Sequence, residues 1–289
     1  MPHGIRRIIT ERIKDSLKVL HSKTGFQDEA VHTIRRELKE ARAALRLVRY
    51  DVGDNLFRQE DATIRDAIRF LSEARDAAVT IQTLDRLLRH SAGKGFQKNF
   101  KPLRAALAER KNRIRRSALG PQHTIKRAET NLQEALARAE RLPIRHKGWK
   151  AVKPGLRKSY EQGRKAMADA LHDGSAEAMH EWRKRIEYQQ DQLEILRNSC
   201  KKEMGLLVRQ AHTLADVLGA NHDLFVLKQL MDGELGHVLG KKQRETLLGL
   251  LAKRQKTLQK KAAKLGQPLC AERGKRFIAR VHGYWQAWR

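Results

Sequence analysis

Apolar residues recur at helical spacing along most of the chain. The clearest instance is residues 32–49, HTIRRELKEARAALRLVR. On a helical wheel its apolar positions share one face: Ile34, Leu38, Ala41, Leu45 and Val48. The opposite face, about 120° wide, carries cations and one histidine but no acid: His32, Arg35, Arg36, Lys39, Arg42 and Arg46. We call these six residues the basic stripe.

The basic stripe departs from an ordinary solvent-facing helix. Such a helix mixes signs, because opposite charges four residues apart support a helix and like charges oppose it. Here Arg35 and Lys39 are like charges at that spacing, and so are Arg42 and Arg46. A helix that keeps this repulsion is expected to present its stripe to something anionic.

The stripe helix occurs twice. Residues 180–197, HEWRKRIEYQQDQLEILR, match it at an offset of 148 residues. The basic stripe residues that recur in this second copy are His180, Arg183 and Lys184. A second pair of segments, residues 71–85 and 218–232, agrees at an offset of 147. Two blocks at nearly one offset indicate that the chain is a duplication.

The rest of the chain shows further helical periods and no useful strand-like alternation. Helices are expected over residues 5–20, 28–50, 56–71, 75–89, 96–119, 123–142, 155–172, 175–197, 202–218, 223–235, 241–265 and 268–288. Residues 142–154 hold two prolines, one glycine and no clear period, so they divide the chain into repeats 1–143 and 144–289. Ser175 is the expected N-cap of the second stripe helix. The sequence predicts an all-α fold of two helical bundles in tandem.

The charge of the chain favours a polyanionic partner. Its 289 residues carry a formal charge of +28, and both repeats contribute to it. Such a field attracts nucleic acid, anionic membrane or polyphosphate. Aromatic residues make up only 5% of the chain, which leaves few platforms for stacking bases.

Other function classes find little support. Cys200 and Cys270 form no CxxC motif, and no histidine or acid cluster has the spacing of metal ligands, so neither a disulfide framework nor a metal or other cofactor is expected. No phosphate-binding glycine loop or nucleophile elbow appears, and we do not expect an enzyme. No apolar run resembles a membrane span or signal peptide, and a cytoplasmic location is the default expectation.

Two His-x-x-Arg-[Arg/Lys] helices, each followed by an [Arg/His]-Asp segment, make the chain resemble the CHAD family, the conserved-histidine α-helical domain. The resemblance covers essentially the whole chain as a single domain. It implies two four-helix repeats related by a pseudo-twofold axis, with a basic central groove or pore lined by the stripe helices. It also implies binding of inorganic polyphosphate, in some members at polyphosphate granules with their proteins.

The resemblance carries a polyphosphate-binding role to the basic stripe and to three residues of the second copy, His180, Arg183 and Lys184. Further expected contributors are Arg65, Arg69, Arg75 and His212. The second copy departs from the family pattern, because Glu187 and Gln190 stand where basic residues are expected. We therefore expect an asymmetric site that the first repeat dominates.

Some interpretations stay open. Arg75 could contact the ligand or an internal partner, and Asp76 and Asp223 are expected to cap helices or to hold a stripe arginine rather than to act as catalytic acids. A nonspecific nucleic-acid-binding helical protein is the main alternative function, since the net charge meets that electrostatic criterion as well. Other polyanions are also expected partners, and a granule scaffold role is compatible with polyphosphate binding.

Overall fold

The chain folds into helices joined by short connections. The computed structural model describes residues 2–22, 28–91, 97–119, 122–197 and 201–287, and within these ranges it contains no strand. The all-α prediction is confirmed. The helices are α1 Pro2–His21, α2 Asp28–Leu47, α3 Arg49–Val52, α4 Asp54–Ser91, the 3-10 turn η1 Lys98–Phe100, α6 Lys101–Leu119, α7 Gln122–Ala139, α8 Trp149–Asp173, α9 Ala176–Arg197, α10 Lys201–Asp232, α11 Lys241–Cys270 and α12 Gly274–Gln286.

Each half of the chain closes a ring of four helices. In the first half α1 packs on α2, α2 on α4, α4 on α7 and α7 on α1. In the second half α8 packs on α9, α9 on α10, α10 on α11 and α11 on α8. The pseudo-twofold relation between the two rings and the repeat boundary at residue 143 stay predictions.

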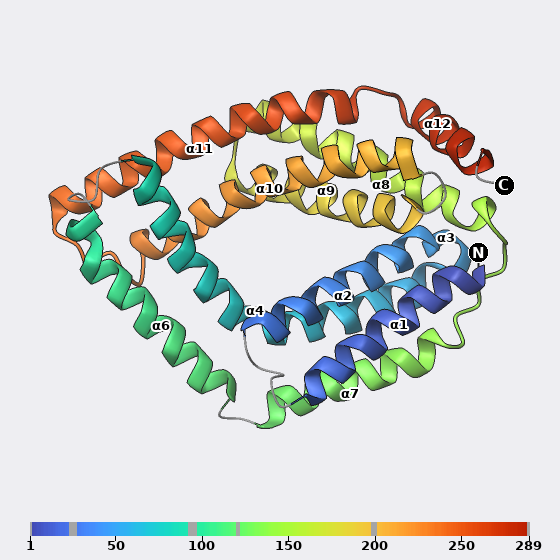
Figure 1. The fold of residues 1–289 in the computed structure, drawn as a ribbon, viewed down its shortest axis with the longest axis horizontal. Helices are drawn as coiled ribbons and strands as arrows, with labels where there is room; N and C mark the ends of the chain where they lie inside the picture. The colour runs from blue at the N-terminus through green and yellow to red at the C-terminus, as the bar shows by residue number, and fades with distance from the viewer. Residues whose placement is uncertain (1, 23–27, 92–96, 120–121, 198–200, 288–289) are drawn as a thin grey trace.

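The two stripe helices, α2 and α9, pack against each other where the two rings meet (Figure 1). The apolar face predicted for α2 is fully buried, with Ile34, Leu38, Ala41 and Leu45 all at 0% exposure. The buried apolar side chains of both halves belong to one continuous cluster. Burial of this face orients α2 so that its basic stripe points away from the core.

Two of the predicted helix breaks are wrong. The helices expected over 56–71 and 75–89 form the single 38-residue α4, because the intervening sequence contains no glycine or proline to end it. The helices expected over 202–218 and 223–235 likewise form α10. A lone glycine costs a packed helix about 1 kcal/mol, which does not suffice for Gly219 to end α10.

Smaller differences concern helix ends. α11 continues through Pro268 to Cys270, and the last helix begins at Gly274 instead of residue 268. Residues 96–119 divide into η1 and α6, and α7 ends at Ala139. The Ser175 N-cap is confirmed, because its Oγ accepts a 3.2 Å hydrogen bond from the Ala178 backbone N–H.

A close backbone approach fixes α8 against the end of α2. A Cβ atom at Gly155 would overlap the backbone carbonyl oxygens of Arg46 and Leu47. Both are main-chain atoms, so a side chain at this position would force the two repeats apart. This contact also holds in place the last turn of the helix that carries the basic stripe.

We expect Gly155→Ala to lower the free energy of unfolding by at least about 2 kcal/mol, because overpacking a closed interface displaces backbone. Gly249→Ala in α11 is the matched control, since no neighbouring atom lies within 4 Å of the place that its added Cβ would take. There the greater helix propensity of alanine should stabilise the protein by up to about 1 kcal/mol. Urea unfolding of both variants checks the prediction, and equal stabilities would contradict it.

Candidate functional site

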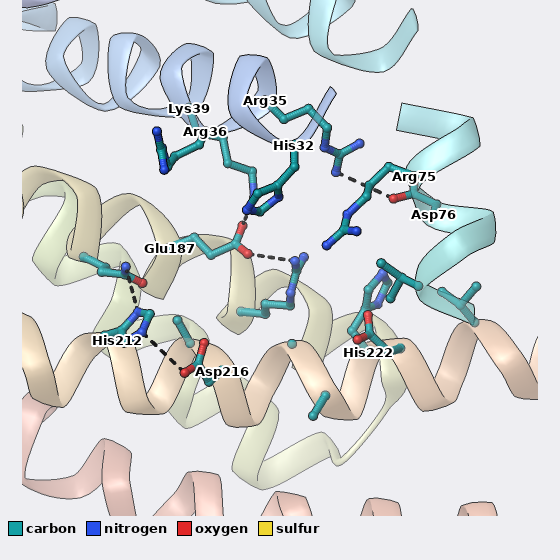
Figure 2. Close-up of a pocket in the computed structure, with 18 of the residues that line it drawn as sticks. His32, Arg35, Arg36, Lys39, Arg75, Asp76, Glu187, His212, Asp216 and His222 are labelled. Atoms are coloured by element: carbon teal, nitrogen blue, oxygen red, sulfur yellow. Dashed lines mark hydrogen bonds and ion pairs between the residues drawn. The ribbon is translucent and has the colours of Figure 1, made fainter. Parts of the chain in front are cut away.

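A solvent-filled cleft of about 900 Å³ lies between four helices, the two stripe helices and the two long helices α4 and α10. We call it the central cleft (Figure 2). Its chemistry-bearing lining residues are His32, Arg35, Arg36 and Lys39 from α2, Arg75, Asp76, Thr80 and Arg86 from α4, Arg183, Glu187, Gln190 and Asp191 from α9, and His212, Asp216, His222 and Asp223 from α10. Seven of the predicted binding residues thus meet in one place.

The continuity of α4 and α10 explains how the cleft walls form. Arg75, Val79 and Arg86 lie four and seven residues apart on α4, so an unbroken helix places all three on one face. On α10 the same argument relates His212, Asp216 and Asp223. The predicted break near residue 220 would separate His212 and Asp216 from Asp223. Arg86 lies in the same predicted helix as Arg75, and no local signal marks it as part of the site.

The central cleft contains acids that the basic stripe itself lacks. Glu187 lies between two cations: Lys39 Nζ is 3.3 Å and Arg183 Nη2 2.7 Å from its carboxylate (Figure 2). On the other wall, Arg35 lies 3.6 Å from Asp76 and Arg86 lies 3.5 Å from Asp223. The described lining holds six Lys and Arg side chains against five carboxyls, so much of the expected positive charge is offset within the cleft.

The geometry bears on two of the open interpretations. Asp76 and Asp223 lie inside long helices, so they are not N-caps. Asp76 instead pairs with the stripe residue Arg35, as one alternative predicted. Arg75 extends into the cleft in Figure 2 and, within the described part of the chain, forms no ion pair. Its guanidinium therefore faces the space that a ligand would fill.

Burial and neighbouring charges shift the pKa values of several titratable groups in the cleft. Burial lowers the pKa of His32, and the positive charge of Arg75 lowers it further. Burial, with Arg183 beside it, lowers the pKa of His222 to about 4. Burial raises the pKa of Asp191 to about 7 despite the favourable charge of Lys39, and the nearby Glu187 adds to the increase. His32 and His222 are thus held neutral in the unliganded cleft.

Four further predicted residues line a different cavity of about 460 Å³, which we call the second hollow. They are Arg42, Arg46, Arg65 and Lys184. Other polar and aromatic residues around it are Arg49, Tyr50, Phe57, Asp61, Lys158, Ser159, Gln162, Arg185 and Tyr188. None of these nine was among the predicted binding residues. Three of them, Lys158, Ser159 and Gln162, lie on α8 and reach the second hollow only through tertiary packing.

Asp61 organises the second hollow. It accepts hydrogen bonds from Arg42 Nε and Nη2 at 2.9 and 3.0 Å, and it lies 2.8 Å from Arg46 Nη1. Burial alone would raise the pKa of Asp61, but these two guanidiniums lower it below its usual range. The Arg46 guanidinium also lies over the Tyr188 ring, 3.9 Å from its centroid.

The two remaining predicted residues lie outside both cavities. Arg69 is exposed on α4. His180 packs against His222 at one end of α9, with 3.3 Å between their Nδ1 atoms. The structure thus divides the predicted set into a central cleft, a second hollow and two outlying residues.

Among the described residues, no group of three or more His, Cys, Asp or Glu side chains could hold a metal ion. The described helices also include none that is long and apolar enough to span a membrane. The family model described as "CHAD domain" matches residues 11–232. No curated protein matches the chain.

The raised pKa of Asp191 predicts a pH-dependent stability. The Asp191 carboxyl binds its proton more tightly in the folded state than in the unfolded chain. The stability that the protonated carboxyl contributes is therefore lost as pH rises from about 4 to 7. Asp191→Asn cannot ionise and should raise the free energy of unfolding at pH 8 by on the order of 2 kcal/mol. At pH 4 the two proteins should be nearly equal. Urea unfolding at both pH values tests this, and a gain of the same size at both would contradict it.

Proposed function

We propose that this chain, which belongs to the CHAD domain family, binds inorganic polyphosphate in its central cleft. That family is associated with polyphosphate binding. The observation that carries the proposal is the convergence of Arg35, Arg36 and Lys39 with Arg75 and Arg183 on one solvent-filled cavity. Polyphosphate offers a flexible row of charges without bases, so its binder needs cationic donors along a track rather than stacking platforms.

The internal ion pairs are compatible with ligand binding. Partly exposed pairs such as Arg35–Asp76 contribute only about 0–1 kcal/mol each, so phosphate oxygens can replace the carboxylates at little cost. Without ligand, the ion pairs fix the positions of these guanidiniums in the cleft. Arginine presents a planar fork that bridges two phosphate oxygens, whereas Lys39 supplies a point charge.

We propose binding rather than catalysis. Phosphoryl transfer requires carboxylates that hold Mg²⁺, but Glu187 and Asp76 are engaged by arginine and lysine side chains. Storage, localisation or association with polyphosphate granules in the cytoplasm are roles that binding alone would serve. Nonspecific attraction of nucleic acid by the net charge of +28 is the alternative.

A competition measurement separates these functions. Labelled long-chain polyphosphate is bound at about 150 mM salt and challenged with four competitors matched for charge: unlabelled polyphosphate, duplex DNA, RNA and heparin. We expect unlabelled polyphosphate alone to compete well, because the described lining of the cleft includes no Phe, Tyr or Trp ring on which a base could stack. Displacement in proportion to charge by all four polymers would favour the nonspecific alternative.

The triple variant Arg35→Ala/Arg36→Ala/Lys39→Ala tests the location. It should abolish polyphosphate binding and keep the helical content, since all three side chains point away from the core. The control removes equal charge from the exposed face of α11 through Lys256→Ala, Lys260→Ala and Lys264→Ala. Equal losses of polyphosphate affinity in both triple variants would show that binding depends on the net charge of the protein and not on the cleft.

Binding should also depend on pH. Phosphate next to His32 raises its pKa from the lowered value of the unliganded cleft, so binding takes up a proton. Affinity at fixed salt is therefore expected to rise by about threefold or more from pH 8 to pH 6. His32→Asn should flatten this profile, whereas His180→Asn, outside the cleft, should keep it. A flat profile in the unmodified protein would exclude His32 as a charge switch.

A further inference from the structure

A third cavity, of about 450 Å³, lies between the beginning of α8 and the end of α12, at the end of the molecule where the C-terminus lies (Figure 1). We call it the aromatic hollow. It shares no described lining residue with the central cleft or the second hollow. Although aromatic residues are scarce in the chain, two of its four tryptophans line this cavity. The rings and cations of the aromatic hollow are Lys147, Trp149, Lys150, Lys153, His282 and Trp285.

Packing fixes the rings of the aromatic hollow. The Trp149 ring stacks on His282, with 5.0 Å between the ring centroids and 16° between the planes, and Trp285 lies 5.8 Å from Trp149. Trp285 is only 4% exposed, and the parallel stack of Tyr160 on Phe277 holds α12 against α8. The rings thus form a surface that is ordered before a ligand arrives, which lowers the entropy cost of binding.

The charged side chains of the aromatic hollow have one sign. Lys147, Lys150 and Lys153 are exposed, and none of them forms an ion pair with the described part of the chain. The described lining of this cavity includes no carboxylate. Most cations of the other two cavities, by contrast, are paired with carboxylates, as Arg185 is with Glu181. Lys150 and Lys153 are three residues apart, so both project from one side of α8 beside the rings.

The combination of unpaired lysines and fixed rings indicates the class of ligand. A quaternary ammonium group also binds between aromatic rings, but the three lysines would repel it. Inorganic phosphate would contact only the lysines. A nucleotide can use both features, because its base stacks on a ring while its phosphate meets the ammonium groups. A cavity of about 450 Å³ is within the range of small-molecule sites.

The concave placement of the rings argues against a membrane as the partner. Tryptophan and lysine are also common at lipid surfaces, but there the apolar side chains project into the bilayer. Here Trp285 is buried, and Trp149 is half-buried and lines a cavity. The large exposed apolar side chains of the described chain do not line this cavity: they are Tyr50, Leu171 and Leu206.

We propose that the aromatic hollow binds a nucleotide unit, with the base stacked on the Trp149 and His282 rings and the phosphate held by the three lysines. The unit is either a free nucleotide or part of a single-stranded nucleic acid, because both present a base beside a phosphate. This local site differs from nonspecific attraction by the net charge. It does not depend on polyphosphate binding, since a nucleotide held here leaves the central cleft open.

Fluorescence anisotropy with a labelled oligoadenylate of about eight nucleotides, at about 150 mM salt, tests this site. Trp149→Leu should weaken binding by about tenfold or more, because the base loses its stacking surface. An oligomer of the same length with abasic sugars should bind the unmodified protein more weakly, and Trp149→Leu should not change its affinity. If circular dichroism shows that Trp149→Leu does not fold, His282→Ala provides the same comparison.

The lysines are tested by a matched pair of double variants. Lys150→Gln/Lys153→Gln should weaken the binding of both oligomers, because both carry the backbone phosphates. The control Lys256→Gln/Lys260→Gln removes the same charge from the exposed face of α11 and should stay within about twofold of the unmodified protein.

Equal affinity of the unmodified protein for the adenylate and abasic oligomers would overturn the proposal, because no base would then be bound. Equal losses in the two lysine variants would overturn it in favour of general charge attraction. If Trp149→Leu instead loses binding to vesicles that contain phosphatidylserine, with oligoadenylate binding unchanged, the aromatic hollow is a membrane contact. Competition with AMP identifies the source of the nucleotide: displacement of the oligomer indicates a site for a free nucleotide, and no displacement indicates one for a single strand.

Discussion

The cations of the basic stripe can be packed together against neighbouring helices only if something offsets their mutual repulsion. In this protein the offset comes from single carboxylates on neighbouring helices: Glu187 on α9 beside Lys39, and Asp76 and Asp61 on α4 beside Arg35 and Arg42. Each acid neutralises part of the charge of the stripe and leaves an excess. The offset is partial, because six Lys and Arg side chains face five carboxyls in the central cleft.

The acids are distributed differently around the two cavities. Five carboxyls face six Lys and Arg side chains in the central cleft. In the second hollow, Arg42 and Arg46 share Asp61. Its outer arginines pair with acids that stand beside the cavity: Arg49 with Asp54, Arg65 with Asp66 and Arg185 with Glu181. Most cations of both cavities thus have an internal partner.

The sequence was sufficient to predict that the chain is helical and which face of α2 is buried, because the spacing of its apolar residues determines both. Ile34 and Leu38 are buried, and Arg35 and Lys39 face the cleft, as that spacing requires. The acids that face the stripe lie 19 to 148 residues away from their partners, and no local pattern reveals such pairings. Arg86 was missed because its partner Asp223 lies 137 residues away in sequence and reaches it only through the packing of α10 on α4.

The Lys39–Glu187 pair has an evolutionary consequence. The two residues occupy equivalent positions of the duplicated helix, 148 apart, and they meet each other at 3.3 Å. In a symmetric homodimer of identical halves, the same contact would bring together two lysines or two glutamates, and like charges would repel. Once a duplication gives each copy its own sequence, the two positions can diverge independently, and a point of self-repulsion can become an attraction.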